Sequence, residues 1–138
     1  MISPKRFTPI ILSLLAILIP SGRGMAQKQG AAQATIPFEF WIAGNRLPAG
    51  HYKIEGVEST TYILFRSTDG KIIQQAYILP LDETPAKPSE AKLVFGIQDG
   101  KHYLYGGWGP YGRRVVTVES TRPAPTGNDR AEVPIIYP

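Results

Sequence analysis

Hydrophobic residues alternate with polar ones, or gather in short runs rich in β-branched and aromatic residues, along most of the chain after residue 30. Such alternation places successive side chains on opposite faces of a strand. No stretch of a dozen residues keeps an apolar face at helical spacing. The pattern therefore predicts strands over residues 35–42, 51–57, 62–66, 72–79, 93–97, 102–105 and 115–118.

The first predicted strand, residues 35–42, has one strongly apolar face made by Ile36, Phe38, Phe40 and Ile42. Trp41 points to the opposite face. Pro37 has no N–H to donate to a neighbouring strand, so it predicts an edge position or the start of a strand. The sequence NRLPAG at residues 45–50 then predicts a turn.

Two Asp-Gly pairs, Asp69-Gly70 and Asp99-Gly100, separate apolar runs. A type I′ turn needs positive φ at both central residues, so each pair predicts a β-hairpin. In the first hairpin one face holds Ile63, Phe65, Ile72 and Ala76, and the other holds Tyr62, Leu64, Ile73 and Tyr77. Because neither face is polar, the hairpin is either covered on both sides or leaves an aromatic face uncovered for binding.

The fold prediction is one all-β domain, a single antiparallel β-sandwich or a small β-barrel of about six to eight strands. The predicted organisation is a signal peptide at residues 1–26, a flexible N-terminus at 27–34, a β domain at 35–120 and a tail at 121–138. The sequence DETPAKPSE at 82–90 predicts an exposed loop. The tail is rich in proline and is predicted to be partly mobile, although residues 135–137 could dock as an edge strand.

The first 26 residues have the features of a cleaved secretory signal. Lys5 and Arg6 precede an apolar run at residues 10–19, and Gly24 and Ala26 supply small residues before a cleavage point at Gln27. The apolar run has about half of the roughly 20 residues needed to span a bilayer, so no membrane span remains after cleavage. We expect an exported protein that is periplasmic or secreted.

Charge and cysteine content narrow the choice of partners. The net charge is +4, but three of the 15 basic residues precede the predicted cleavage point, and the remaining chain is close to neutral. Its basic residues are scattered, with Arg113-Arg114 the one adjacent pair after that point, which argues against nucleic acid and for a solvated surface. The chain has no cysteine, so neither disulfides nor a lipid-modified N-terminal cysteine are available. The oligomeric state is left open.

Two segments carry a resemblance to a known family. The sequence IPFEF at residues 36–40 and LPAGHYKI at 47–54 resemble the opening of a family of small exported bacterial proteins with an IPFxF…LPAGxYxV pattern and no characterised activity. The later KLVF at 92–95, the hairpin to Tyr103, Trp108 and residues 112–120 resemble the second half of that family. The resemblance implies export and a compact β domain, and it brings no functional residues with it.

Aromatic residues concentrate in the stretch HYLYGGWGPYGRR at residues 102–114, which holds Tyr103, Tyr105, Trp108 and Tyr111 among four glycines. Flat rings beside glycines suit stacking on sugars, peptides or other rings. The alternative is that these rings fill a core around a bulged turn. Trp41, opposite the apolar face of the first strand, is the fifth candidate for ligand binding.

No catalytic or cofactor-binding motif is apparent. The two histidines, His51 and His102, each precede a tyrosine, and their spacing does not indicate zinc. There is neither a nucleophile elbow nor a phosphate loop. The sequence therefore favours a non-catalytic exported domain that binds a partner protein or a cell-envelope component. Two alternatives stay open: a small carbohydrate-active or other hydrolytic enzyme that uses scattered carboxylates, and a structural accessory domain.

Overall fold

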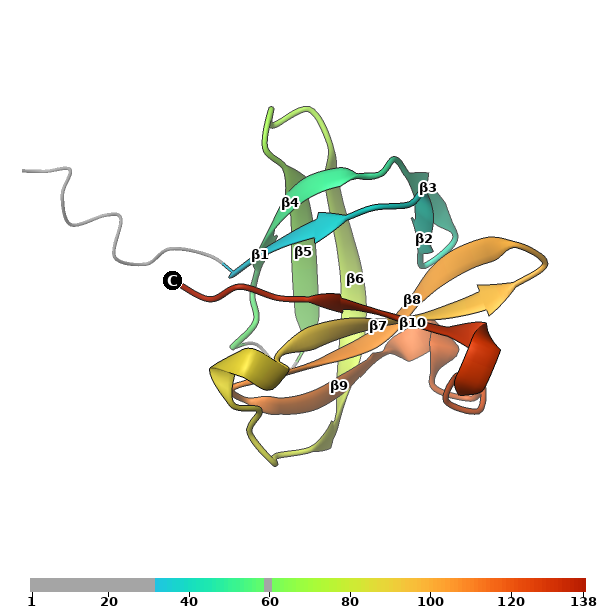
Figure 1. Ribbon diagram of the computed structural model, residues 1–138. Helices are drawn as coiled ribbons and strands as arrows, with labels where there is room; N and C mark the ends of the chain where they lie inside the picture. The colour runs from blue at the N-terminus through green and yellow to red at the C-terminus, as the bar shows by residue number, and fades with distance from the viewer. Residues whose placement is uncertain (1–31, 59–60) are drawn as a thin grey trace, which may run out of the picture. The chain divides into compact units, whose positions relative to one another are not determined.

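A computed structural model of the protein describes residues 32–58 and 61–138 (Figure 1). The predicted signal peptide and most of the predicted flexible N-terminus lie outside the described residues. The described part has ten strands and three short 3₁₀-helices, which confirms the all-β prediction. The strands are β1 (Ala32–Ile36), β2 (Phe40–Ile42), β3 (Asn45–Leu47), β4 (Gly50–Glu55), β5 (Tyr62–Ser67), β6 (Ile73–Asp82), β7 (Lys92–Gln98), β8 (Lys101–Gly109), β9 (Gly112–Val116) and β10 (Arg130–Pro134). The 3₁₀-helices are η2 (Pro88–Glu90), η3 (Thr117–Glu119) and η4 (Gly127–Asp129).

All ten strands belong to one mixed sheet. Its main path runs β1-β4-β5-β6-β9-β8-β2-β3, and β7 pairs with β8 and with β10. Neighbouring strands are antiparallel except for β2 and β8, which are parallel. The sheet is not closed, because β10 and β1 approach each other without a ladder between them (Figure 1). One isolated bridge joins these ends, in which Gln33 and Ile136 exchange N–H···O bonds of 2.9 and 2.8 Å.

The strand count exceeds the predicted six to eight because the N-terminal segment up to Leu47 forms three strands instead of one and the predicted tail forms β10. The predicted strand over residues 35–42 ends at Ile36 and resumes at Phe40, since Pro37 interrupts the backbone pairing. A two-residue turn at Ala43 and Gly44 follows, with φ of 48° and 87°. The segment predicted as a turn at 45–50 therefore contains β3, because an alanine in a left-handed turn gives no sequence signal.

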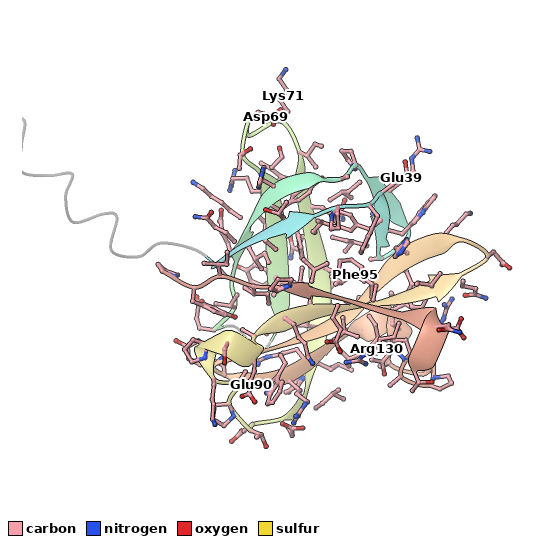
Figure 2. The ribbon with its side chains drawn as sticks, in the orientation of Figure 1. Glu39, Asp69, Lys71, Glu90, Phe95 and Arg130 are labelled. Atoms are coloured by element: carbon pink, nitrogen blue, oxygen red, sulfur yellow. The ribbon has the colours of Figure 1, made fainter. Side chains whose placement is uncertain are left out.

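The two Asp-Gly hairpins differ in their turns. Asp99 and Gly100 have φ of 52° and 76° between the paired residues Gln98 and Lys101, as a two-residue type I′ turn requires. The other hairpin has a five-residue loop, residues 68–72. Its Asp69 carboxylate accepts the N–H of Lys71 at 2.9 Å and the hydroxyl of Ser67 at 2.7 Å, which lowers the Asp69 pKa. Asp69 and Lys71 lie at the tip of this hairpin in Figure 2.

The core is organised around four aromatic rings, those of Phe40, Tyr52, Phe65 and Phe95. Phe40 lies edge-on to Tyr52 at 5.4 Å and to Phe95 at 5.6 Å between ring centroids, a favoured aromatic geometry. The buried Tyr52 hydroxyl donates to the carbonyl of Pro48 at 2.6 Å, so its polar end is satisfied. Figure 2 shows Phe95 in the middle of the domain. Each ring comes from a different strand, so the cluster ties together strands far apart in sequence.

The β5–β6 hairpin has one covered face. Phe65 and Ala76 are buried and Ile63 and Ile72 pack against the core, as the alternation predicts. On the other face Tyr62, Ile73 and Tyr77 are exposed. Of the two arrangements left open by the sequence, the structure shows the uncovered aromatic face.

The C-terminal segment packs into the domain. β10 pairs with β7 in an antiparallel register that places Val133 opposite Leu93. Beyond β10, the Ile135 N–H donates to the Ala91 carbonyl at 3.0 Å. Val133 and Ile135 are both buried. The β domain therefore extends from Ala32 past the predicted boundary at residue 120. The docking expected for residues 135–137 occurs through the single bridge at Ile136.

Deletion of residues 135–138 is expected to lower the free energy of unfolding by about 2–4 kcal/mol, because it removes a buried isoleucine and the bridge between the sheet ends. Urea unfolding of the truncated and full-length proteins measures the difference. Deletion of Pro138 alone is the control, since this residue is exposed. Equal stability of the chain lacking residues 135–138 and the full-length chain would contradict the role given to this segment.

Candidate functional site

Four of the five predicted aromatic site residues lie on the outer face of the sheet. Trp41 follows the buried Phe40, and Tyr103 and Tyr105 flank the buried Leu104, so strand alternation turns all three away from the core. Trp108 has the same orientation, because it pairs with Lys92 and Arg113 on that face. Tyr111, the fifth, lies in the turn between β8 and β9 with 53% of its surface exposed.

Trp41 and Tyr103 form one group, at the start of β8. They are register partners in the parallel β2–β8 pair. The Lys101 ammonium lies 4.9 Å from the Trp41 ring centroid, and the Arg122 guanidinium lies 5.0 Å from that of Tyr103. Both rings therefore have a cation over one face.

The Tyr103 ring also has a structural role. It covers Gly96 of β7 so closely that a Cβ added to Gly96 would lie 2.2 Å from the ring. The glycine is buried as a result. Tyr103 therefore packs against the sheet on the outer face, where its ring occupies the volume that a side chain at Gly96 would need.

Trp108 anchors the loop that precedes β7. Its indole N–H donates to the Thr84 carbonyl at 2.8 Å. The Arg113 guanidinium stacks 4.0 Å from the ring centroid, and the Lys92 ammonium lies 6.0 Å away. Trp108 is thus held between β7 and β9 and is not a free stacking platform.

Ion pairs extend this arrangement across the neighbouring strands. Arg113 pairs with Asp82 of β6 at 3.1 Å, and Glu132 of β10 pairs with Lys92 at 3.1 Å and Arg130 at 2.7 Å. The pKa of Glu132 is lowered chiefly by the hydrogen bond from Arg130. Figure 2 shows Arg130 beside β10. On the outer face, Trp108 therefore has a cation on each neighbouring strand, Arg113 on β9 and Lys92 on β7. The next strand on each side carries a carboxylate, Asp82 on β6 and Glu132 on β10.

The pKa of Asp82 is lowered as well, chiefly because its carboxylate accepts the N–H of Thr84 at 3.0 Å and then because Arg113 is close. Thr84 is also the residue whose carbonyl Trp108 binds. The loop after β6 is therefore attached to the outer face both through its backbone N–H and through its backbone carbonyl.

A groove of about 250 Å³ lies on this face, and it is the candidate functional site. Tyr105, Trp108 and the half-exposed Leu81 provide its aromatic and aliphatic surfaces. The full lining is Leu81, Lys92, Val94, Tyr105, Gly107, Trp108, Arg113, Arg114, Ala124 and Arg130. Four lining residues are basic and none is acidic. Three of these cations pair with Asp82 or Glu132 beside the groove, so a positive excess remains, which favours negatively charged groups.

The structure brings two of the predicted site residues, Tyr105 and Trp108, into this groove and places Trp41, Tyr103 and Tyr111 outside it. Sequence reasoning missed Leu81, Lys92 and Arg130. Leu81 directly precedes the predicted exposed loop and belongs to no motif. Lys92 lies on β7, the partner of β8 in the predicted Asp99-Gly100 hairpin, but nothing in the sequence marks it as a site residue. Arg130 lies within the predicted tail, on β10, which pairs with β7. The groove was therefore predictable only in its aromatic half.

The histidines have separate roles. His51 is exposed, and its ring nitrogen Nδ1 lies 2.7 Å from the Thr35 hydroxyl. His102 stacks on Phe38 with 3.8 Å between ring centroids. Across residues 32–58 and 61–138, no three His, Cys, Asp or Glu side chains gather in a way that would hold a metal ion.

No helix in the described part of the chain is long and apolar enough to cross a membrane. Comparison of the chain with protein-family models, with curated proteins and with solved structures finds no match. The family resemblance seen in the sequence therefore stays a prediction.

Substitution of Gly96 by alanine is expected to destabilise the protein by about 1–3 kcal/mol, because the new methyl group overlaps the Tyr103 ring. In the Tyr103→Ala background the same substitution should cost much less. Urea unfolding of the four proteins of this double-mutant cycle measures the coupling. Additive effects of the two substitutions would show that the ring does not fill this space.

The Glu132 carboxyl is expected to titrate below its ordinary pKa of about 4.3. A carboxyl with a lowered folded-state pKa stabilises the fold above the unfolded-state pKa, and this contribution is lost as the pH falls through the folded-state value. Arg130→Gln should raise the Glu132 pKa more than Lys92→Gln does, because the Arg130 hydrogen bond is the main cause. Carbon-detected NMR titration of the Glu132 side chain measures all three values. An unchanged midpoint in Arg130→Gln would contradict this assignment.

Proposed function

We propose that this protein is an exported, non-catalytic binding domain that holds an acidic, partly apolar segment of a partner protein in the groove at Tyr105, Trp108 and Leu81. The observation that carries the proposal is the combination of tyrosine, tryptophan and arginine in one exposed groove. These residue types are the ones enriched at the energetic centres of protein interfaces. The groove's basic lining gives the preference for an acidic partner.

The surface next to the groove supports a macromolecular partner over a small ligand. Tyr77 and Leu79 share one face of β6, and Leu81 follows at the register shift between Pro80 and Asp82. These three residues have 63%, 43% and 57% of their surfaces exposed. This row leads from the uncovered face of the β5–β6 hairpin to the groove. A contiguous exposed apolar surface with a charged rim is typical of a protein-binding site.

Side-chain contact fits the geometry better than strand addition at a sheet edge. β3, at one end of the main path, has three residues and offers a short template. At the other end, the terminal strands β1 and β10 approach each other, and Gln33 of β1 already bonds to Ile136, just after β10. A partner that adds a strand would need a longer free edge than either end provides.

The hydrolytic alternative lacks a supporting observation. A general acid needs a carboxyl whose pKa is raised toward neutral pH. Each described carboxyl with a shifted pKa, at Asp69, Asp82 and Glu132, is shifted downward by hydrogen bonds and cations. These groups stay ionised and serve the structure.

Leu81→Ser and Tyr105→Ala are expected to reduce retention of the partner by at least about tenfold, because each removes apolar contact area from the groove. The measurement passes a cell-envelope extract over the immobilised protein and quantifies the retained proteins by mass spectrometry. Val118→Ser is the matched control, since Val118 lies outside both the groove and the row on β6 and is 63% exposed, against 57% for Leu81.

Thermal unfolding of each variant confirms that the fold is intact. Partner retention that is equal in the wild type, the groove variants and the Val118→Ser control would contradict the proposal. Absence of any specifically retained protein would instead favour the structural accessory alternative.

A further inference from the structure

A second, interior site lies on the opposite face of the sheet from the groove side chains. It is a chamber of about 50 Å³ that opens to solvent at one end of the core. Its inner wall is aliphatic and is made by Ile54, Ile63, Ile78, Leu93, Val116 and Ile135. The glycine-rich end of β8 and the turn to β9, with Tyr111 and Tyr137, line the rest of it.

One charged group lines this apolar chamber, the guanidinium of Arg114. Arg114 lies two residues before the buried Val116 on β9 and pairs with Gly107, so strand alternation turns its side chain inward. Its Nη1 donates to the Tyr111 carbonyl at 3.0 Å. Its Nε is buried and has no hydrogen-bond partner in the described part of the chain, and Arg114 makes no ion pair there.

A buried donor without a partner is costly, and the cost is larger for a charged group. An anion beside Arg114 would satisfy this donor and the charge together. Tyr137 lies close by, with its hydroxyl packed over Gly109, and burial raises its pKa to about 12. The phenol is therefore neutral at pH 7 and does not compete for the guanidinium as an anion.

We propose that this chamber binds a carboxylate that carries a short apolar tail, with the carboxylate on Arg114 and the tail against the aliphatic wall. The size of the chamber limits the tail. A single water needs roughly 10–15 Å³ on this measure, so 50 Å³ has room for a few carbon atoms. This site takes a different ligand from the partner groove, although Gly107, Trp108 and Arg114 border both.

The experiment titrates ¹⁵N-labelled protein with n-alkanoates from propanoate to octanoate and follows backbone amide shifts. Binding should tighten by about fourfold for each added methylene group and then level off once the chamber is full. The amides of Ile54, Ile78 and Val116 should shift most. Absence of shifts at these residues across the series would overturn the proposal.

The role of the charge is tested by comparing hexanoate with hexanol, which has the same tail and no charge. The wild type should bind hexanoate at least about tenfold more tightly. In Arg114→Gln this preference should disappear while hexanol binding is kept, which also shows that the variant is folded. Equal binding of the two ligands by the wild type would overturn the assignment of Arg114.

The location is tested with a matched pair of substitutions. Val57 lines the chamber, whereas Val118 lies outside it with 63% of its surface exposed. Val57→Phe should abolish hexanoate binding, and Val118→Phe and the groove variant Leu81→Ser should leave it unchanged. Unchanged binding in Val57→Phe would place the ligand elsewhere and overturn the proposal.

The same chemistry has two natural sources, a free carboxylic acid and the C-terminus of a peptide that ends in an apolar residue. Hexanoate represents the first and N-acetylnorleucine the second. Binding of either one at Ile54, Ile78 and Val116 supports the site and identifies the source. Binding of neither overturns it.

Discussion

The structure depends on the backbone pairing of one strand, β8, with three others. Along one edge it pairs with β7 over nearly its full length. Along the other edge it pairs first with β2, in parallel, and then with β9. A strand has only two edges, so the second edge must be divided, and the register shift opposite Val94 and Phe95 lies near this division. The pairing joins the N-terminal strands to the C-terminal ones and places the aromatic residues of β8 on the outer face.

The glycines of β8 follow from this arrangement. A Cβ at Gly106 would lie 2.2 Å from the carbonyl oxygen of Arg114, so the neighbouring backbone approaches too closely for a side chain. Gly107 borders both the groove and the chamber. The absence of side chains at these positions leaves space on both faces of the sheet. The proposed partner groove and the proposed carboxylate chamber therefore share one thin stretch of backbone.

Local rules predicted much of the fold from the sequence. The Asp99-Gly100 turn and the two faces of the β5–β6 hairpin follow from φ preferences and alternation, which depend on neighbouring residues alone. Ala43-Gly44 was missed because alanine seldom adopts positive φ. The β2–β8 pair and the bridge from Gln33 to Ile136 join residues distant in sequence, and no local pattern encodes such pairings.

The candidate sites, like the fold, were predictable from the sequence only where a local pattern sets the position of a side chain. Alternation was enough to expect that Trp41 lies opposite the apolar face of its strand. For Tyr105 the sequence left open whether the ring fills the core or lies on a binding surface. It did not show that Trp108 is bound to the Thr84 carbonyl, or that Tyr103 fills the space above Gly96. The sequence predicts Arg114 on a solvated surface, because the basic residues are scattered along the chain and form no patch. Its inward direction follows from the register with Gly107, which only the assembled sheet reveals.

Backbone amide hydrogen exchange tests the central claim, that β8 is the strand on which the sheet depends. Amides of β8 that are bonded to β7, β2 or β9 should exchange among the slowest in the protein, close to the rate set by global unfolding. Amides of the terminal strand β3 should exchange much faster. Exchange in β8 that is as fast as in β3 would contradict the account.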